Sequence, residues 1–453
     1  MADLQSTFQY VDANFDRFVG DLQALCAQPS IAAQGVGIAE TAELVAARLR
    51  SVGASVQIVP TAGSPVVMGV VPGESERTML FYNHYDVQPP EPLDKWISPP
   101  FSPTIRDGHL YARGVVDNKG HFLSRIHAVE ALLKTRGRLP CTVKFLVEGE
   151  EEVGSPHLAA FAEAHKPLWQ ADACIWETGY IAEDGTPMAR FGYKGMLYVE
   201  LSAAGANTDL HSRQAPIMPH PAWDLVHALA TLRTRDGRVR IPGFYDGIKP
   251  PSAAEEAALA ALPMNAAKLL GRLGLSQFPR GMSTPEAVRA LYTEPTCTIC
   301  GLLSGYTGPG KKTVLPCEAS VKIDFRLVVG QDPADIFEKL KAHLQAEGFG
   351  HLEVRCTGKA YAYKTSLDSP LVAMLADVAQ LVYGKPLAIE PTAAGTSPMY
   401  VLARLHSMPM SSIGVGWPGA NVHAPNESLR LEDYRRGIKY MAAMLDRFAT
   451  CKL

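Results

Sequence analysis

The sequence predicts an α/β protein: a mixed, largely parallel sheet flanked by helices, with an inserted α+β two-layer sandwich. Three observations lead to this prediction. Apolar strand patterns alternate with amphipathic helix patterns up to about residue 190. From about Gly192 the strands show alternating polar and apolar residues. The first style, apolar strands that alternate with amphipathic helices, returns after about residue 362. Strands that alternate with helices indicate a sheet with helices packed on its faces.

The first part of the chain shows helix and strand patterns in turn. Residues 4–27 and 38–52 have apolar positions at helical spacing, and a glycine ends the second stretch. There follow expected strands at 66–71 and 78–87, a helix at 118–137, and strands at 141–149 and 171–178. The proline-rich stretch 89–103 is interpreted as a surface loop. Ligand sites in such sheets lie beyond the carboxyl ends of the strands.

The middle of the chain differs in style. Expected strands lie at 195–205, 295–305 and 318–329, and expected helices at about 219–234 and 333–347. Two helices with about four strands indicate a compact sandwich. Patterns of the first style then recur at 369–384, 407–416 and 431–449. We therefore predict one domain from residues 1–194 and 362–453, and an inserted domain from residues 195–361.

Composition excludes several classes of protein. Of the 453 residues, 47% are hydrophobic and 20% are charged, and the net charge is −3, which is typical of a soluble protein that binds no nucleic acid. No apolar run reaches the roughly 18 residues that span a bilayer, and no signal pattern opens the sequence, so we expect a cytoplasmic protein without a membrane partner. Cys297 and Cys300 form a C-x-x-C within a strand pattern, which we interpret as packing because structural zinc normally needs four ligands.

Polar residues collect where the expected strands end. His84 and Asp86 are two positions apart and would share one face of a strand. Imidazole is a good zinc ligand, and a nearby carboxylate can hold its second nitrogen. A lone His-x-Asp is nevertheless more often a histidine on a turn. Asp117, taken alone, is best explained as a helix cap.

Three consecutive carboxylates follow another expected strand, at Glu150, Glu151 and Glu152. Adjacent carboxylates repel one another, so their position at a strand end needs an explanation. Glu177 follows a further strand, and His423 lies in a late loop. Each residue has an ordinary structural explanation. Together, two histidines and several acids at strand ends fit two metal ions held by histidine and carboxylate ligands.

Five segments occur in this order: "HYDVQP", "ARGVVDNKG", "EGEEEVGS", "ETG" and "NVHAPNE". With them the sequence resembles the di-zinc exopeptidases and deacylases that include carnosine dipeptidase, aminoacylase, carboxypeptidase G, acetylornithine deacetylase and succinyl-diaminopimelate desuccinylase. The resemblance spans essentially the whole chain, and its organisation is most similar to the carnosine dipeptidase branch. It implies a zinc-exopeptidase-like catalytic domain and an inserted domain that acts as a lid and forms a homodimer.

The resemblance also implies a metal site with two divalent ions, zinc being expected and manganese or cobalt being alternatives. One ion would be held by His84 and Glu177, the other by Glu152 and His423, and Asp117 would bridge both.

Two further residues would act beside the metals. Asp86 would orient His84, and Glu151 would be the general base that takes a proton from the bridging water, leaving hydroxide, and passes it to the leaving nitrogen. Nearby dications would remove the repulsion within the acidic run. Glu150 is expected to point elsewhere.

In the inserted domain the resemblance implies a substrate-binding role for several residues. His211 would stabilise the oxyanion, from the partner subunit in dimeric relatives, and Arg326 would bind the substrate carboxylate. The loop of Gly395, Thr396 and Ser397 would face the substrate. Alternatively, Arg326 forms a salt bridge on the strand face and His211 is structural.

Two departures from the family pattern leave the substrate open. Arg213 stands where relatives usually have glycine. Glu177 stands where dipeptidases usually have aspartate and deacylases or carboxypeptidases usually have glutamate. The expected substrate is therefore a small peptide or N-acyl amino acid with a free carboxylate.

Lid closure would require hinges near Gly192–Gly195 and Lys359–Tyr363.

Two other classes of function are alternatives. The chain could be a non-catalytic, metal-binding relative on the same scaffold, because a fold does not guarantee an activity. It could also be a metal-free glycosidase that uses Asp117, Glu151 and Glu177 as acid and base. No paired spacing of carboxylates supports the second class, and it leaves both histidines unexplained.

Overall fold

The computed structural model describes residues 4–453, and the chain divides into two compact units. Unit 1 comprises Met1–Gly192, Thr365–Pro391 and Val401–Leu453, and unit 2 comprises Tyr193–Lys364 and Thr392–Tyr400. The segment Thr392–Tyr400 thus belongs with unit 2, although the sequence-based division placed it in the first domain. Each unit has its own hydrophobic core.

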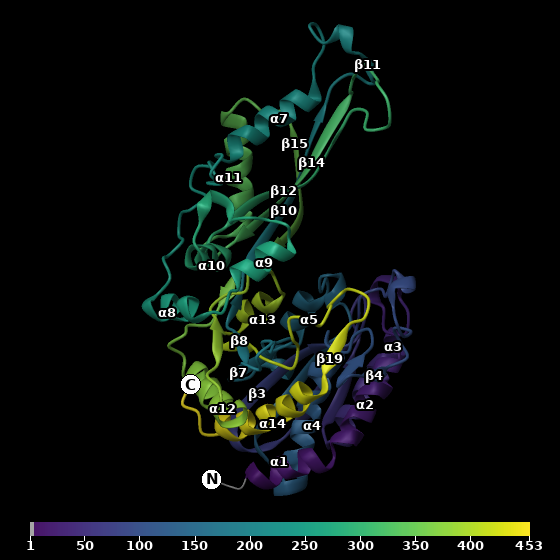
Figure 1. Cartoon of the computed structure of the whole chain (residues 1–453), viewed down its shortest axis with the longest axis vertical. Helices are drawn as coiled ribbons and strands as arrows, with labels where there is room; N and C mark the ends of the chain where they lie inside the picture. Colours follow the sequence, from purple (N-terminus) through teal and green to yellow (C-terminus); the bar gives the residue numbers. More distant parts are fainter. Residues whose placement is uncertain (1–3) are drawn as a thin grey trace. The chain divides into compact units, whose positions relative to one another are not determined.

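Within residues 4–453, unit 1 contains an eight-stranded mixed sheet with the order β1-β2-β6-β3-β7-β18-β8-β17 (Figure 1). The strands are β1 Ser55–Val59, β2 Val66–Val71, β3 Gly73–His84, β6 Leu139–Glu148, β7 Ala173–Trp176, β8 Met188–Arg190, β17 Ala388–Glu390 and β18 Met410–Ser412. β3 runs parallel to β6 and β7, and β18 runs parallel to β7. The carboxyl ends of these central strands therefore meet at one edge of the sheet, as the sequence predicted.

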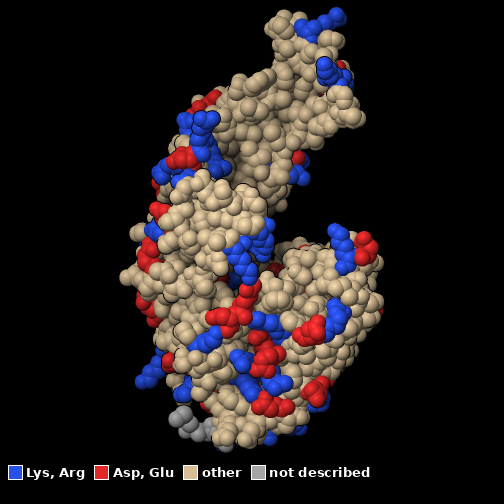
Figure 2. Space-filling model, viewed as in Figure 1, with Lys and Arg blue, Asp and Glu red and all other residues tan. Residues whose placement is uncertain are grey.

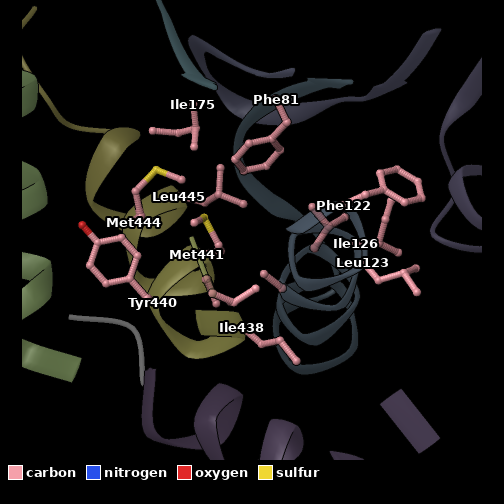
Figure 3. Close-up of a cluster of buried hydrophobic side chains, with 14 of the residues drawn as sticks. Phe81, Phe122, Leu123, Ile126, Ile175, Ile438, Tyr440, Met441, Met444 and Leu445 are labelled. Carbon is pink, nitrogen blue, oxygen red and sulfur yellow. The ribbon is translucent and has the colours of Figure 1, made fainter. Parts of the chain in front are cut away.

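Helices cover this sheet. They are α1 Leu4–Ala13, α2 Phe15–Ala27, α3 Ile38–Ser51, α4 Lys119–Arg136, α5 Leu158–Ala164, α6 Lys166–Trp169, α12 Pro370–Tyr383, α13 Met399–Leu405, whose first residues belong to unit 2, and α14 Leu431–Phe448. Figure 3 shows side chains of α4 and α14 meeting those of β3 and β7, among them Phe122, Leu445 and Phe81. Burying each side chain of this size contributes about 1.5–3 kcal/mol to the stability of the fold. This packing therefore holds α4 and α14 against the strands.

A small three-stranded sheet joins distant parts of unit 1. It has the order β19-β5-β4, with β4 Thr104–Arg106, β5 His109–Tyr111 and β19 Ser428–Arg430. The sequence analysis did not predict these short strands. Their pairing brings the chain just before Asp117 beside the chain just after His423.

Unit 2 is an α+β sandwich, which confirms the predicted fold class. Its described residues form an antiparallel sheet of order β12-β14-β10-β15, with β10 Gly195–Ala204, β12 Thr296–Ser304, β14 Glu318–Leu327 and β15 Glu353–Ala360. Helices α7 Pro221–Leu232 and α11 Pro333–Ala346 pack on it. Cys297 belongs to this core and Cys300 is exposed, in line with the packing interpretation.

Unit 2 also has elements that the sequence analysis missed. These are α8 Ala253–Ala261, α9 Ala266–Arg272, α10 Thr284–Thr293, and the paired short strands β11 Leu210–His211 and β13 Val314–Leu315. Two more short strands, β9 Gly192–Tyr193 and β16 Tyr363–Lys364, pair with each other. Among residues 4–453, no helix is both long and apolar enough to span a bilayer.

Candidate metal centre

The carboxyl edge of the unit 1 sheet brings together ligand-type side chains from different strands. His84 is the last residue of β3 and is 1% exposed, and Glu177 directly follows β7. The Nε2 atom of His84 lies 3.0 Å from Oδ1 of Asp117 and 4.0 Å from Oε2 of Glu177. Because β3 and β7 are parallel neighbours, their carboxyl ends place these side chains at the same edge of the sheet.

Asp117 lies between two histidines. Its Oδ1 atom faces His84, and its Oδ2 atom is 3.1 Å from Nε2 of His423. The same Nε2 atom of His423 is 3.1 Å from Oε2 of Glu152. One carboxylate thus faces two histidines with separate oxygens, which is what a ligand bridging two metal ions requires.

The donor atoms are close enough to bind a metal. Those of His84, Glu151 and Glu177 lie within 4.8 Å of one another, and so do those of His84, Asp117 and Glu152. Imidazole nitrogen and carboxylate oxygen suit zinc, and also manganese or cobalt, so the donor set fits the implied ions. Glu151, expected as a base, is near enough to count among the donors of the first group.

Asp86 organises both sides of the cluster. It is completely buried, and its Oδ1 atom lies 3.4 Å from Nδ1 of His84. The carboxylate also accepts the backbone N–H of Glu151, at 3.2 Å, and that of Glu152, at 3.0 Å. Asp86 therefore orients a histidine on β3 and simultaneously anchors the 3₁₀ turn Glu151–Val153 (η3).

The electrostatics of the cluster favour a bound cation. Burial and the charge of Glu177 raise the pKa of Glu151 well above its usual value. Hydrogen bonds to Asp117 and Glu152 raise the pKa of His423 to about 10. Burial alone would raise the pKa of Asp117, but the hydrogen bonds from His423 and His84 hold it well below its usual value. Carboxylates that are buried together repel one another, and a positive charge among them removes this repulsion.

The loop that carries His423 is unusual in its backbone. His423 has φ 63°, and Asn421 and Asn426 also have positive φ values. A residue with a side chain rarely adopts this left-handed region, and such conformations cluster at functional sites. The side chain of His423 is 53% exposed, so the cluster is reached from solvent on this side.

Glu150 differs from its two neighbours. Its Oε2 atom is 2.7 Å from Nδ1 of His157, so the carboxylate is directed to that histidine. The three consecutive acids therefore have separate environments, and only Glu151 and Glu152 belong to the donor groups.

The other sequence-predicted residues belong to unit 2. Arg326 on β14 donates from Nη1 to Oγ1 of Thr396, at 2.8 Å, and from Nε to Oδ2 of Asp324, also at 2.8 Å. Arg326 thus contacts the loop of Gly395, Thr396 and Ser397 and also forms the alternative strand-face salt bridge. Within that loop the oxygen of Gly395 accepts the N–H of Lys194 at 3.0 Å, and Ser397 is buried.

His211 lies in β11 and is exposed. Its Nδ1 atom accepts a hydrogen bond from the backbone N–H of Arg213, at 3.1 Å, so one of its two ring nitrogens is occupied within the chain.

Sequence reasoning missed two buried residues that hold the centre. Arg125 on α4 donates to the backbone oxygens of Tyr82, Trp176 and Glu177, and so ties the ends of β3 and β7 together. Glu427 accepts the backbone N–H groups of Gly114, Val116 and Asp117. No side-chain pattern reveals such contacts, because their partners are backbone atoms distant in the sequence.

Histidine and carboxylate donors gathered at the parallel edge of an α/β sheet form a site that can hold metal ions for hydrolysis. Comparison with known proteins agrees: the model of "Peptidase family M20/M25/M40" matches residues 80–447. The chain belongs to this family.

Three similar proteins span nearly the whole chain. The M20 family metallo-carboxypeptidase Sso-CP2 from Sulfolobus solfataricus is 37% identical, with a TM-score of 0.89, covering 95% of this chain and 99% of that one. Human carnosine dipeptidase 1 is 26% identical, with a TM-score of 0.81, covering 99% of each chain. The Cys-Gly metallodipeptidase dug1 of Schizosaccharomyces pombe is 26% identical, covering 99% of this chain and 98% of the relative.

Proposed function

We propose that this enzyme hydrolyses an amide bond in small peptides or N-acyl amino acids that end in a free carboxylate. It would use two divalent ions, and zinc is the expected metal. The proposed ligands are His84, Asp117, Glu152, Glu177 and His423. The observation that supports this most strongly is the position of Asp117, whose two oxygens face two different histidines.

The five ligands would hold two dications, which would supply Lewis acidity and lower the pKa of a bound water to about 7. The remaining steps belong to residues of the chain. Glu151 accepts the proton of the attacking water at its carboxylate and later gives it to the leaving nitrogen. Asp86 keeps Glu151 in place through the backbone of η3.

Unit 2 supplies the proposed contacts with the substrate. Arg326 would bind the free carboxylate, since a guanidinium offers paired donors that match its two oxygens. The contact with Thr396 supports this role, because it presents Arg326 beside the loop that contains Gly395 and Ser397. His211 would donate from its ring to the oxyanion.

The substrate is proposed to be attacked at its carboxyl-terminal amide bond, with the amine side blocked or extended. Two observations support this choice over a free dipeptide. The chain is 37% identical to a protein named a metallo-carboxypeptidase and 26% identical to a carnosine dipeptidase. Glu177 also matches the residue that deacylases and carboxypeptidases usually have.

A matched hydrolysis assay tests the proposal. Zinc- or manganese-loaded protein receives free dipeptides, the same compounds with an acetylated amine, and the acetylated compounds with an amidated carboxyl end. We expect fastest cleavage of the acetylated acids and little cleavage of the amides. Faster cleavage of free dipeptides would make the enzyme a dipeptidase, and no cleavage in any metal would leave a non-catalytic relative.

A homodimer through unit 2 is also proposed. β12 is an edge strand of its sheet, and edge strands offer unpaired backbone groups to a second chain. It contains no charged residue, and Ile299, Leu302 and Leu303 are 51%, 55% and 66% exposed. Figure 2 shows few charged side chains over this part of unit 2.

A further inference from the structure

Glu427 is a completely buried carboxylate whose two oxygens are both used. Oε1 accepts the backbone N–H of Val116, at 2.9 Å, and that of Asp117, at 3.1 Å. Oε2 accepts the backbone N–H of Gly114 and a bond from Nη1 of Arg113, both at 2.8 Å. Four donors converge on one side chain, and charge-assisted bonds of this kind are roughly twice as strong as neutral ones.

These donors all belong to one turn, which ends at Asp117. Gly114 has φ 81°, a left-handed conformation that glycine adopts without a steric cost. Without Glu427, three N–H groups of this turn would be buried without their acceptor, and an unsatisfied buried donor is costly. The carboxylate therefore determines the path of the backbone that presents Asp117.

Glu427 also lies four positions after His423, in the same loop. Glu427 thus connects the loop that carries His423 to the turn that carries Asp117. The chain paths themselves are already held by β5 and β19, which pair through Ser428, Leu429 and Arg430. The carboxylate acts beyond this ladder, on Arg113 and on the turn 114–117.

We propose that Glu427 is a positioning residue that sets the geometry between Asp117 and His423 before any metal binds. The inference rests on the proposed two-ion site. It assigns a role in metal affinity to a residue that is not among the proposed ligands.

The variant Glu427→Gln separates this role from simple packing. An amide has nearly the same shape, but one of its two ends is an NH₂ donor. In either orientation of the amide, its NH₂ group faces two of the four donors that Glu427 accepts in the parent protein. Two donors cannot form a hydrogen bond with each other. The expected result is a displaced turn and a metal affinity lower by about 10- to 100-fold, the usual effect of removing a partner that orients a ligand.

A second carboxylate of unit 1 that connects separate segments of the chain provides the control. Glu130 on α4 accepts a hydrogen bond from Tyr10 of α1, at 2.8 Å, and contacts Arg17 of α2. It joins three helices as Glu427 joins two loops, yet it contacts none of the proposed ligands. Glu130→Gln should therefore lower the thermal stability while leaving metal affinity within about twofold of the parent.

Metal affinity is measured by competition with a chelator, using Zn²⁺ and Co²⁺, and the Co²⁺ absorption spectrum reports the ligand geometry. Weaker binding with an altered spectrum in Glu427→Gln alone supports the proposal. Parental affinity and spectrum in Glu427→Gln overturn it, and so does an equal loss in both variants. If the parent binds no metal, the proposed function fails.

Hydrogen exchange on the unmutated, chelated protein gives a second test that depends on no variant. The N–H groups of Gly114, Val116 and Asp117 should exchange as slowly as the strand amides of β3, with or without metal. Rapid exchange that becomes slow only after metal is added would overturn the inference, because the ions would then order the turn. This measurement keeps its meaning even if Glu427→Gln does not fold or the parent binds no metal.

Discussion

Asp117 and His423 are 306 residues apart in the chain, and Oδ2 of the first lies 3.1 Å from Nε2 of the second. The other oxygen of Asp117 faces His84 at 3.0 Å. The site therefore depends on closure of the chain by β5 and β19 and by Glu427, not on any single local motif.

This relationship predicts that His423 and His84 serve different ions. His423→Ala should reduce bound zinc from two equivalents to one, because the histidine of the second site is lost while His84 and Glu177 remain. The measurement is metal analysis after dialysis. His157→Ala, at the histidine that contacts Glu150, is the control and should retain two equivalents. Loss of both ions in His423→Ala would contradict the separate sites.

Arg326 is predicted to recognise the carboxylate of the substrate. Arg326→Gln should lower kcat/KM by about 10- to 100-fold, mainly through KM, because a hydrogen bond to a charged group contributes about 1.5–3 kcal/mol. The same variant should lose its preference for the free acid over the amide. Arg355→Gln, on β15 of the same sheet and paired with Glu200, is the control and should behave as the parent.

His121 is predicted to make the metal-free protein sensitive to acid. Its Nε2 atom lies 3.1 Å from the N–H groups of Gly179 and Val415, so the ring must be neutral to accept them. Burial lowers the pKa of His121 to about 4, against 6.5 for the ordinary side chain. Between these values the unfolded chain binds more protons than the folded one, so the free energy of unfolding falls as the pH falls from 6.5 to 4.

The loss amounts to at most about 3 kcal/mol over that window. It is measured by denaturant unfolding at several pH values in the presence of a chelator. His121→Gln should show a shallower dependence on pH. Parallel curves for parent and variant would show that His121 does not cause the effect.

The proposed dimer predicts a change of mass on mutation of β12. Leu303→Glu should convert a dimer into a monomer, because it places a charge on the exposed apolar edge. Sedimentation velocity measures the mass. Leu381→Glu is the control, since Leu381 is 49% exposed on α12 of unit 1, and it should leave the mass unchanged. A parent that sediments as a monomer would refute the dimer at once.

The sequence predicted the larger elements of the fold because their apolar periodicity is strong. The stretch around β3 and the long helix α4 are examples. Short elements such as β4, β5 and β19 were missed, since three residues hold no periodic pattern. Thr392–Tyr400 was placed in the first domain because patterns of that domain return after about residue 362, but the segment belongs with unit 2, where Thr396 accepts a hydrogen bond from Arg326.

The candidate site was predictable in part for a similar reason. His84, Glu177 and the acidic run are polar residues directly after buried strands, and parallel strands bring such positions together. Glu427 and Arg125 were not predictable, because each acts on backbone atoms of segments far away in the sequence. Such contacts depend on the tertiary structure and leave no spacing rule in the sequence.

The central claim is that Glu151 moves the proton in a metal-dependent hydrolysis, and neighbouring residues allow a direct test. Glu151→Gln and Glu150→Gln are prepared side by side, loaded with zinc, analysed for metal, and assayed on the best acetylated substrate. We predict that Glu151→Gln retains its metal and loses about 10²–10⁴-fold in kcat, whereas Glu150→Gln stays within a fewfold of the parent. Parental activity in metal-loaded Glu151→Gln would contradict the account.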